Sequence, residues 1–297
     1  MNQAALTARH VKWLLSGLLG SFLLSPPASA QIGPGPVLLS APSASSHSEV
    51  TEYDGSPDGP AQKNKIQNSS SSDRIAPVLL KRAWADQKGI YSAPFHRHNL
   101  KWDALFLAAT GALIATDKHV TGAIPSGNIS ISQHISDAGF YSTVGTTGIL
   151  LVSGILKKNE HAQETGILAF EAFGNTLAVD AVTQLVAGRE RPLEGSGHGR
   201  FWVNNNVTSA LPSMHSSLAW SLASVLAHEY PSPWVQLLAY GTATTVSVTR
   251  VTGLKHFPAD VAVGGVFGYF IGQQIFHRHS RLFQAHHDHK IHVPNSE

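Results

Sequence analysis

The stretch 161–187 reads HAQETGILAFEAFGNTLAVDAVTQLVA and predicts the longest helix of the chain. Its large apolar residues recur at helical spacing, at Ile167, Phe170, Leu177 and Leu185. Only Gly174 interrupts the pattern. No segment of the chain shows the strict alternation of apolar and polar residues that is typical of a strand. The chain is therefore expected to be all-α.

Five further helical patterns flank this stretch, at about 100–116, 137–158, 213–231, 234–251 and 258–275. Together they predict one domain over residues 76–277, a single bundle of about six helices. The uncharged runs Ala138–Leu156 and Pro231–Thr249 approach the length of a membrane span. They are rich in Gly, Ala, Ser and Thr, however, which equally suits the buried helices of a soluble bundle. A soluble or surface-associated bundle is slightly favoured over a membrane-embedded one.

The first 30 residues are typical of a secretory signal peptide. Arg9 and Lys12 precede the apolar run Trp13–Leu24, and Ala28-Ser29-Ala30 offers a cleavage site of small residues. An uncleaved membrane anchor is the alternative. Residues 31–75 are rich in Ser, Pro and Gly and predict a disordered spacer. We therefore expect an exported protein, located in the periplasm.

The overall composition and the C-terminal residues argue against two classes of partner. The 21 Lys and Arg nearly balance the 19 Asp and Glu, for a net charge of +2, so a nucleic-acid partner is not expected. The segment 278–297 is rich in histidine and is predicted to be a flexible tail. Metal binding by this tail is a weaker alternative, because no regular ligand spacing accompanies the histidines. No metal site is predicted in the domain.

Three short clusters carry residues suited to binding phosphate. They read QLVAGRERP (184–192), PSMH (212–215) and TRVTGLKHFPAD (249–260). Arg191 and Arg250 supply planar, permanently charged donors. Ser213 is predicted as the N-cap of a helix, which would direct the N–H groups of Met214 and His215 toward an anion.

Two histidines in these clusters are suited to acid–base and nucleophilic chemistry. His256 and Asp260 are four residues apart, with Pro258 suited to a first helical turn. This spacing predicts that both side chains share one helix face, where Asp260 accepts one ring N–H and leaves the other nitrogen free to attack. His215, with a pKa near neutrality, is predicted to protonate the leaving group.

These clusters resemble the signature of the type 2 phosphatidic acid phosphatase and vanadium-dependent haloperoxidase superfamily. That signature is Lys-x6-Arg-Pro, then Pro-Ser-Gly-His, then Ser-Arg-x5-His-x3-Asp. The resemblance implies a helical bundle in which His256 forms a phosphohistidine and Asp260 orients it. His215 would act as general acid and then as general base, and no metal cofactor would be needed. The phosphoryl oxygens would be held by Arg191, Arg250 and Ser213. In a haloperoxidase, the position of His256 would instead bind vanadate as cofactor.

The sequence departs from this signature at three positions. Gln184 stands where the family has lysine; it keeps a hydrogen-bond donor for phosphate, two helical turns before Arg191, but loses a charge. The loss would weaken phosphate binding by about 1–3 kcal/mol. Arg189 or Lys255 is expected to compensate. Met214 replaces glycine, which changes little if only its backbone N–H binds phosphate. Thr249 replaces serine and keeps the hydroxyl.

The resulting hypothesis is an exported, metal-independent phosphatase of phosphate monoesters. A lipid phosphate such as phosphatidic acid or an isoprenyl phosphate is the favoured substrate, with a membrane surface as a further partner. A soluble nonspecific acid phosphatase and a vanadium haloperoxidase remain alternatives. A helical module that binds phosphate or lipid without turnover is the alternative that is not an enzyme.

Overall fold

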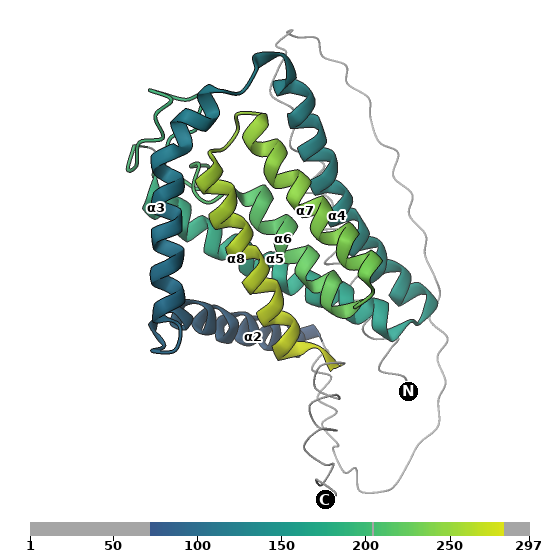
Figure 1. The fold of residues 1–297 in the computed structure, drawn as a ribbon. Helices are drawn as coiled ribbons and strands as arrows, with labels where there is room; N and C mark the ends of the chain where they lie inside the picture. The colour runs from purple at the N-terminus through teal and green to yellow at the C-terminus, as the bar shows by residue number, and fades with distance from the viewer. Residues whose placement is uncertain (1–71, 204, 282–297) are drawn as a thin grey trace, which may run out of the picture. The chain divides into compact units, whose positions relative to one another are not determined.

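A computed structural model describes residues 72–203 and 205–281, with side chains from Leu80 onward (Figure 1). These residues form α-helices, two short 3₁₀ turns and no strand, which confirms the all-α prediction. The helices are α2 (Ser72–Ser92), α3 (Leu100–Gly122), α4 (Ile129–Lys157), α5 (Glu160–Ala187), α6 (Met214–Glu229), α7 (Pro233–Thr252) and α8 (Pro258–His279).

The described residues include one helix more than the six that were expected. α2 begins at Ser72, inside the segment predicted as spacer, and continues through a stretch for which no helix was predicted. From Pro77 onward the helices belong to one compact unit. The predicted signal peptide, the spacer up to residue 71 and the tail beyond residue 281 lie outside the described residues.

α4 begins eight residues before the expected start at Asp137 (129 against 137), because its polar first turns face the interior. Ser132 and Ser136 are buried. The Ser132 hydroxyl accepts a hydrogen bond from Thr252 of α7 at 2.9 Å. α4 and α7 lie side by side along this contact (Figure 1). Polar residues that break an apolar pattern are therefore part of a helix–helix contact here.

α6 is the central helix of the bundle. Nearly all of its residues are buried, and it packs against α5, α7 and above all α8. The approach to α8 is close because glycines face α6: a Cβ on Gly268 would overlap the backbone carbonyl of Ser217. The backbone N–H of Ser213 donates to the carbonyl of Asp260 at 3.0 Å. This packing brings the N-terminal ends of α6 and α8 together, and both carry predicted site residues.

The outer faces of the bundle are apolar. Large exposed side chains occur on α3 (Leu100, Trp102, Leu105, Leu107), α4 (Ile131, Ile135, Ile149, Leu156), α5 (Phe170, Val182, Leu185, Val186) and α7 (Trp234, Leu237, Leu238, Val248). Within the described residues, one helical segment, Ser126–Lys157, is long and apolar enough to cross a membrane. Only 28% of its most apolar window is buried inside the protein.

Candidate active site

The predicted site residues come from three segments that meet at one end of the bundle. Arg191 lies in the connection after α5, His215 lies in the first turn of α6, and Arg250 and His256 lie at the end of α7 and in the turn before α8. The charges of both arginines lower the pKa of both histidines. His256 likewise lowers the pKa of His215. The two histidines and two arginines, which were predicted from separate clusters, therefore lie close enough in the structure to influence one another electrostatically.

His256 is held by a backbone carbonyl. Its Nδ1 lies 2.9 Å from the carbonyl oxygen of Ala210 and 3.7 Å from Oδ2 of Asp260. His256 and Asp260 do not share a helix face, because α8 begins at Pro258 with Phe257 as its N-cap and His256 precedes the helix, but the two side chains still approach each other as predicted. With Nδ1 engaged by Ala210, Nε2 is the ring nitrogen left for chemistry.

The environment of His256 keeps its imidazole neutral. The side chain is 3% exposed. Burial lowers its pKa, and the charges of Arg250 and Arg191 lower it further, while Asp260 opposes the shift. A neutral imidazole is the form that can attack an electrophile.

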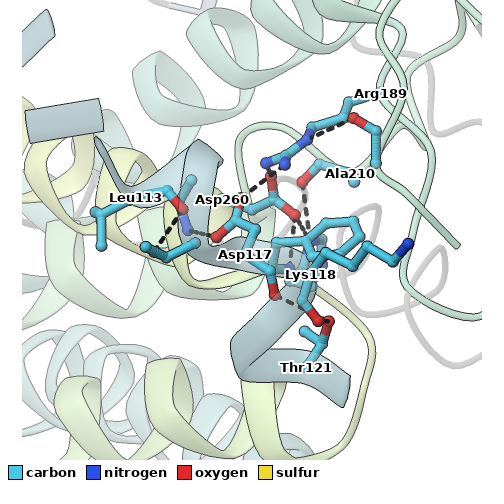
Figure 2. Close-up of polar contacts among 12 residues, drawn as sticks. Leu113, Asp117, Lys118, Thr121, Arg189, Ala210 and Asp260 are labelled. Atoms are coloured by element: carbon cyan, nitrogen blue, oxygen red, sulfur yellow. Dashed lines mark hydrogen bonds and ion pairs between the residues drawn. The ribbon is translucent and has the colours of Figure 1, made fainter. Parts of the chain in front are cut away.

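Asp260 occupies the third position of α8 and is fully buried. Its Oδ2 accepts the backbone N–H of Phe257 at 2.8 Å, which caps the helix. Its Oδ1 accepts Nη1 of Arg189 at 2.6 Å, as Figure 2 shows. Both carboxylate oxygens of Asp260 therefore have a hydrogen-bond partner other than His256.

Arg189 does not replace the missing lysine. Its side chain is 1% exposed and lies between two buried carboxylates: Nη2 donates to Asp117 at 2.6 Å, and Nη1 donates to Asp260 (Figure 2). The compensating role expected for Arg189 is therefore wrong, because its charge is already balanced inside the protein. The same role for Lys255, which is partly exposed, stays a prediction.

Arg250 and His215 share an acidic neighbour on α4. Nη1 of Arg250 lies 3.1 Å from Oδ1 of Asp137, and Nε2 of His215 lies 3.7 Å from the same oxygen. Burial, followed by the charges of Arg250, His256 and Arg191, lowers the pKa of His215 to about 3. The expectation of a near-neutral pKa is wrong for this structure, because burial of the imidazole and the nearby charge of Arg250 both disfavour its protonated form.

Ser213 is the N-cap of α6, as predicted, and Met214 is the first helical residue. Early N–H groups of a helix have no acceptor within the helix, so those of Met214 and His215 are available to an anion. Among the described residues, three buried donor atoms around this end lack a hydrogen-bond partner: Oγ of Ser213, Nε of Arg191 and Nε of Arg250. Nε of Arg191 lies 4.0 Å from a carboxylate oxygen of Glu194. All three can donate to an anion.

Gln184 supports the backbone next to this anion site. Its Nε2 donates to the carbonyl of Pro212 at 2.9 Å, and the side chain is buried. The predicted alignment with Arg191 is wrong, because α5 ends at Ala187 and Gly188 reverses the chain with φ +51°. Arg191 instead donates from Nη2 to the carbonyl of Thr208 at 3.0 Å.

The connection that carries Arg191 is tied together by a buried acid. Arg200 contacts the Glu190 carboxylate at 2.8 Å, and the Ser196 hydroxyl donates to it at 2.8 Å. These hydrogen bonds lower the pKa of Glu190 to about 2. Residues 190–200 of the connection between α5 and α6 therefore support the arginine with their own internal ion pair.

Comparisons with known proteins find one family that this chain resembles. Residues 166–284 match the model of the PAP2 superfamily. Over these residues the chain is similar to the PAP2 superfamily. Residues 166–284 include every residue of the three clusters that were singled out in the sequence.

A curated relative and a solved structure are also similar to this chain. The chain is 25% identical over 105 residues to the lipid A 1-phosphatase of Porphyromonas gingivalis, a match that covers 35% of this chain. The chain spans about a quarter of the length of that relative (24%). A solved structure, a transmembrane PAP2-type phosphatidylglycerolphosphate phosphatase from Bacillus subtilis, aligns with a TM-score of 0.43 and 18% identity. That alignment covers 74% of this chain and 98% of the other.

Three groups in the site were not identified from the sequence: the carboxylates of Asp117 and Asp137, and the carbonyl of Ala210. Asp117 carried a usable signal, because it follows the uncharged run 104–116 of an apolar helix and burial of a lone acid demands a partner. Asp137 directly precedes a second uncharged run, 138–156. The carbonyl carries no signal at all, since any residue type provides one.

Proposed function

We propose that this protein hydrolyses phosphate monoesters, with lipid phosphates as substrates, through a phosphohistidine at His256. One observation carries the proposal: a buried His256, with Nδ1 fixed and its pKa lowered, lies electrostatically coupled to His215 and to two arginines whose Nε atoms lack a hydrogen-bond partner within the described residues. This combines a nucleophile, a proton carrier and donors for a phosphoryl group at one place.

The donors suit the charge of a phosphate ester. Arg191 and Arg250 provide cationic N–H groups, and Ser213 provides a hydroxyl at a helix N-terminus that favours anions. Charge that develops on the phosphoryl oxygens would be stabilised by donors already in place. Because these groups supply the positive charge, we propose a reaction that needs no metal ion.

The reaction has two displacements. Nε2 of His256 attacks phosphorus, the bond from phosphorus to the alcohol oxygen breaks, and His215 gives that oxygen a proton. His215 then takes a proton from water, the resulting hydroxide attacks the phosphohistidine, and phosphate and free His256 result. The positive charge that forms on the imidazole during the first step is offset by Asp260.

Substrate binding prepares His215 for its role as acid. Its pKa of about 3 is set by burial and by the charges of Arg250, His256 and Arg191. A phosphate bound between these groups adds negative charge, which raises the pKa of His215 and favours its protonated form. The proton is therefore supplied where a substrate is bound.

A lipid substrate is supported by the outer surface and by the relative. Exposed apolar residues on α3, α4, α5 and α7 would lie in water in a free protein but could contact acyl chains at a bilayer. The similar Porphyromonas gingivalis protein is described as a lipid A 1-phosphatase. We propose that the protein associates with a membrane on the exported side, in the periplasm.

The test measures phosphate release from phosphatidic acid in mixed micelles and from p-nitrophenyl phosphate, both with EDTA. His256→Ala is compared with His228→Ala, a matched histidine change on α6 near the opposite end of that helix. We expect His256→Ala to abolish release and His228→Ala to retain it. Rapid acid-free quenching with ³²P-labelled substrate should trap a labelled histidine in the wild type. Equal release by both variants would refute the mechanism. Halide oxidation that requires vanadate and peroxide would indicate a haloperoxidase instead.

A further inference from the structure

Three buried charged groups form a continuous chain beside the nucleophile. Arg189 contacts Asp117 and Asp260, each at 2.6 Å, and all three side chains are at most 2% exposed. Asp117 comes from α3, Arg189 follows α5 and Asp260 lies in α8, so the chain joins three elements that are distant in sequence. With two carboxylates and one guanidinium, the cluster carries a formal charge of −1.

The guanidinium of Arg189 is held in one orientation. Its Nε donates to the carbonyl of Gly199 at 3.2 Å, while Nη1 and Nη2 donate to the carboxylates of Asp260 and Asp117. The rings of Phe201 and Phe257 lie against it, with centroids 5.0 Å and 4.6 Å from Cζ. A planar group bound on every side cannot adjust to a displaced partner.

Arg189 reaches His256 by two routes. Through its side chain it fixes Oδ1 of Asp260, the carboxylate 3.7 Å from the His256 ring. Through its backbone it accepts the N–H of Ala210 at 2.8 Å, and the Ala210 carbonyl in turn binds Nδ1 of His256 at 2.9 Å. Both groups that face Nδ1 therefore depend on Arg189.

Asp117 connects this arrangement to α3. Its Oδ2 binds Arg189, and its Oδ1 accepts the backbone N–H of Ala259 in the first turn of α8 at 3.0 Å (Figure 2). Burial raises the pKa of Asp117, and the hydrogen bonds from Arg189 and Ala259 oppose the shift. One aspartate thus holds both the arginine and the start of the helix that carries Asp260.

We propose that Asp117 and Arg189 are positioning residues for the nucleophile: they set the orientation of His256 and supply the net negative charge that stabilises its imidazolium. This inference rests on the proposed function of His256. It makes α3, which contributes no group to the phosphate site, a required part of the catalytic machinery. Neither residue touches the reacting atoms.

A purely structural role is the competing explanation, and a matched buried acid separates the two. Asp86 is 1% exposed and binds two basic side chains, Arg278 and His279, each at 3.0 Å, away from the active site. Asp86→Asn should therefore lower the melting temperature without altering catalysis. Asp117→Asn should lower the melting temperature and also reduce catalysis.

The experiment compares Asp117→Asn, Arg189→Lys and Asp86→Asn in the full chain, using p-nitrophenyl phosphate. For the first two we expect kcat to fall by about 10- to 100-fold, the loss that accompanies a small misplacement of reacting groups. KM should change by no more than about 3-fold, because the phosphate donors remain. Asp86→Asn should retain wild-type kcat.

The pKa of His256, followed by NMR in ¹⁵N-histidine-labelled protein, separates charge from geometry. Asp117→Asn removes one negative charge, so the imidazolium is less stable and the pKa falls; the acid limb of kcat/KM should move to lower pH with it. Arg189→Lys keeps the positive charge but loses the planar guanidinium that binds both carboxylates, so kcat should fall with little change in the pKa of His256.

Wild-type kcat and an unchanged His256 pKa in folded Asp117→Asn would overturn the inference. The same result in Arg189→Lys would overturn it where Asp117→Asn does not fold. A wild-type protein without turnover would instead refute the proposed function, and the NMR titration would still decide the positioning role.

Discussion

Replacing Asp180 with asparagine should stabilise the protein at neutral pH and remove part of its pH dependence. Asp180 lies in the middle of α5 and is fully buried. Among the described residues, neither carboxylate oxygen has a hydrogen-bond partner. Burial raises its pKa from an ordinary value of 3.8 to about 8, and the nearby Ser217 hydroxyl only partly opposes this.

The direction of the pH dependence of stability follows from the number of protons that the folded and unfolded states bind. Between the unfolded pKa of 3.8 and the folded pKa of about 8, the folded protein holds a proton that the unfolded chain releases. The free energy of unfolding therefore falls as pH rises through this window, by about 1.4 kcal/mol per pH unit. Asparagine does not titrate, so the stability advantage of Asp180→Asn should grow with pH until about pH 8 and then level off.

The assay is thermal unfolding of both proteins from pH 5 to pH 8.5 in one detergent and at constant ionic strength. Each kcal/mol corresponds to about 2–4 °C in a domain of this size. The difference between variant and wild type is the relevant quantity, because other titrating groups cancel in it.

Asp86→Asn serves as a control of opposite sign. Burial raises the pKa of Asp86, but hydrogen bonds from His279 and Arg278 outweigh it and the net pKa is lowered. Its contribution is present above the unfolded pKa and is lost as pH falls, so Asp86→Asn should destabilise at neutral pH. A difference between Asp180→Asn and wild type that stays constant from pH 5 to 8.5 would refute the assignment of a protonated Asp180.

Two substitutions and one pH profile also test the site. Gln184→Lys should lower KM for p-nitrophenyl phosphate by about 10-fold, because it adds a cation worth about 1.5 kcal/mol in a charged hydrogen bond; an unchanged KM would show that charge at this position is not limiting. His215→Ala should reduce kcat on phosphatidic acid by about 100-fold or more, and much less on p-nitrophenyl phosphate, whose leaving group needs no proton; equal losses would contradict its role as acid. Because burial lowers the pKa of His256, the acid limb of kcat/KM should lie below pH 6.5; a limb at higher pH would mean a different titrating group.

Features that depend on a few neighbouring residues were predictable. Helical periodicity identified α3 to α8, with ends displaced by up to eight residues at α4 (129 against 137). Ser213 at the N-cap and Pro258 at the first helical turn both hold in the structure. The family signature located both histidines and both arginines. These signals are local, because capping and helix spacing act within one or two turns.

Which face of each helix is buried was not evident. In α5, Phe170 and Leu185 belong to the apolar pattern that predicted the helix, yet both are more than 40% exposed, whereas Leu168 and Ala172 are buried. Periodicity reports that a helix forms, but a helix apolar on several sides leaves its orientation to the neighbours that pack against it. The exposed apolar surface that supports membrane association follows from this packing.

By itself, the sequence determined the helical class, the helix starts that carry the site and the identity of the candidate site residues. Only the tertiary structure decided how these side chains are held. Asp117 meets Arg189 across 72 positions, and His256 meets the carbonyl of Ala210 across 46. Such pairings depend on the relative placement of whole helices. A buried arginine takes whichever carboxylates the packing presents, and a histidine takes whichever carbonyl lies in reach, so no local pattern encodes either contact.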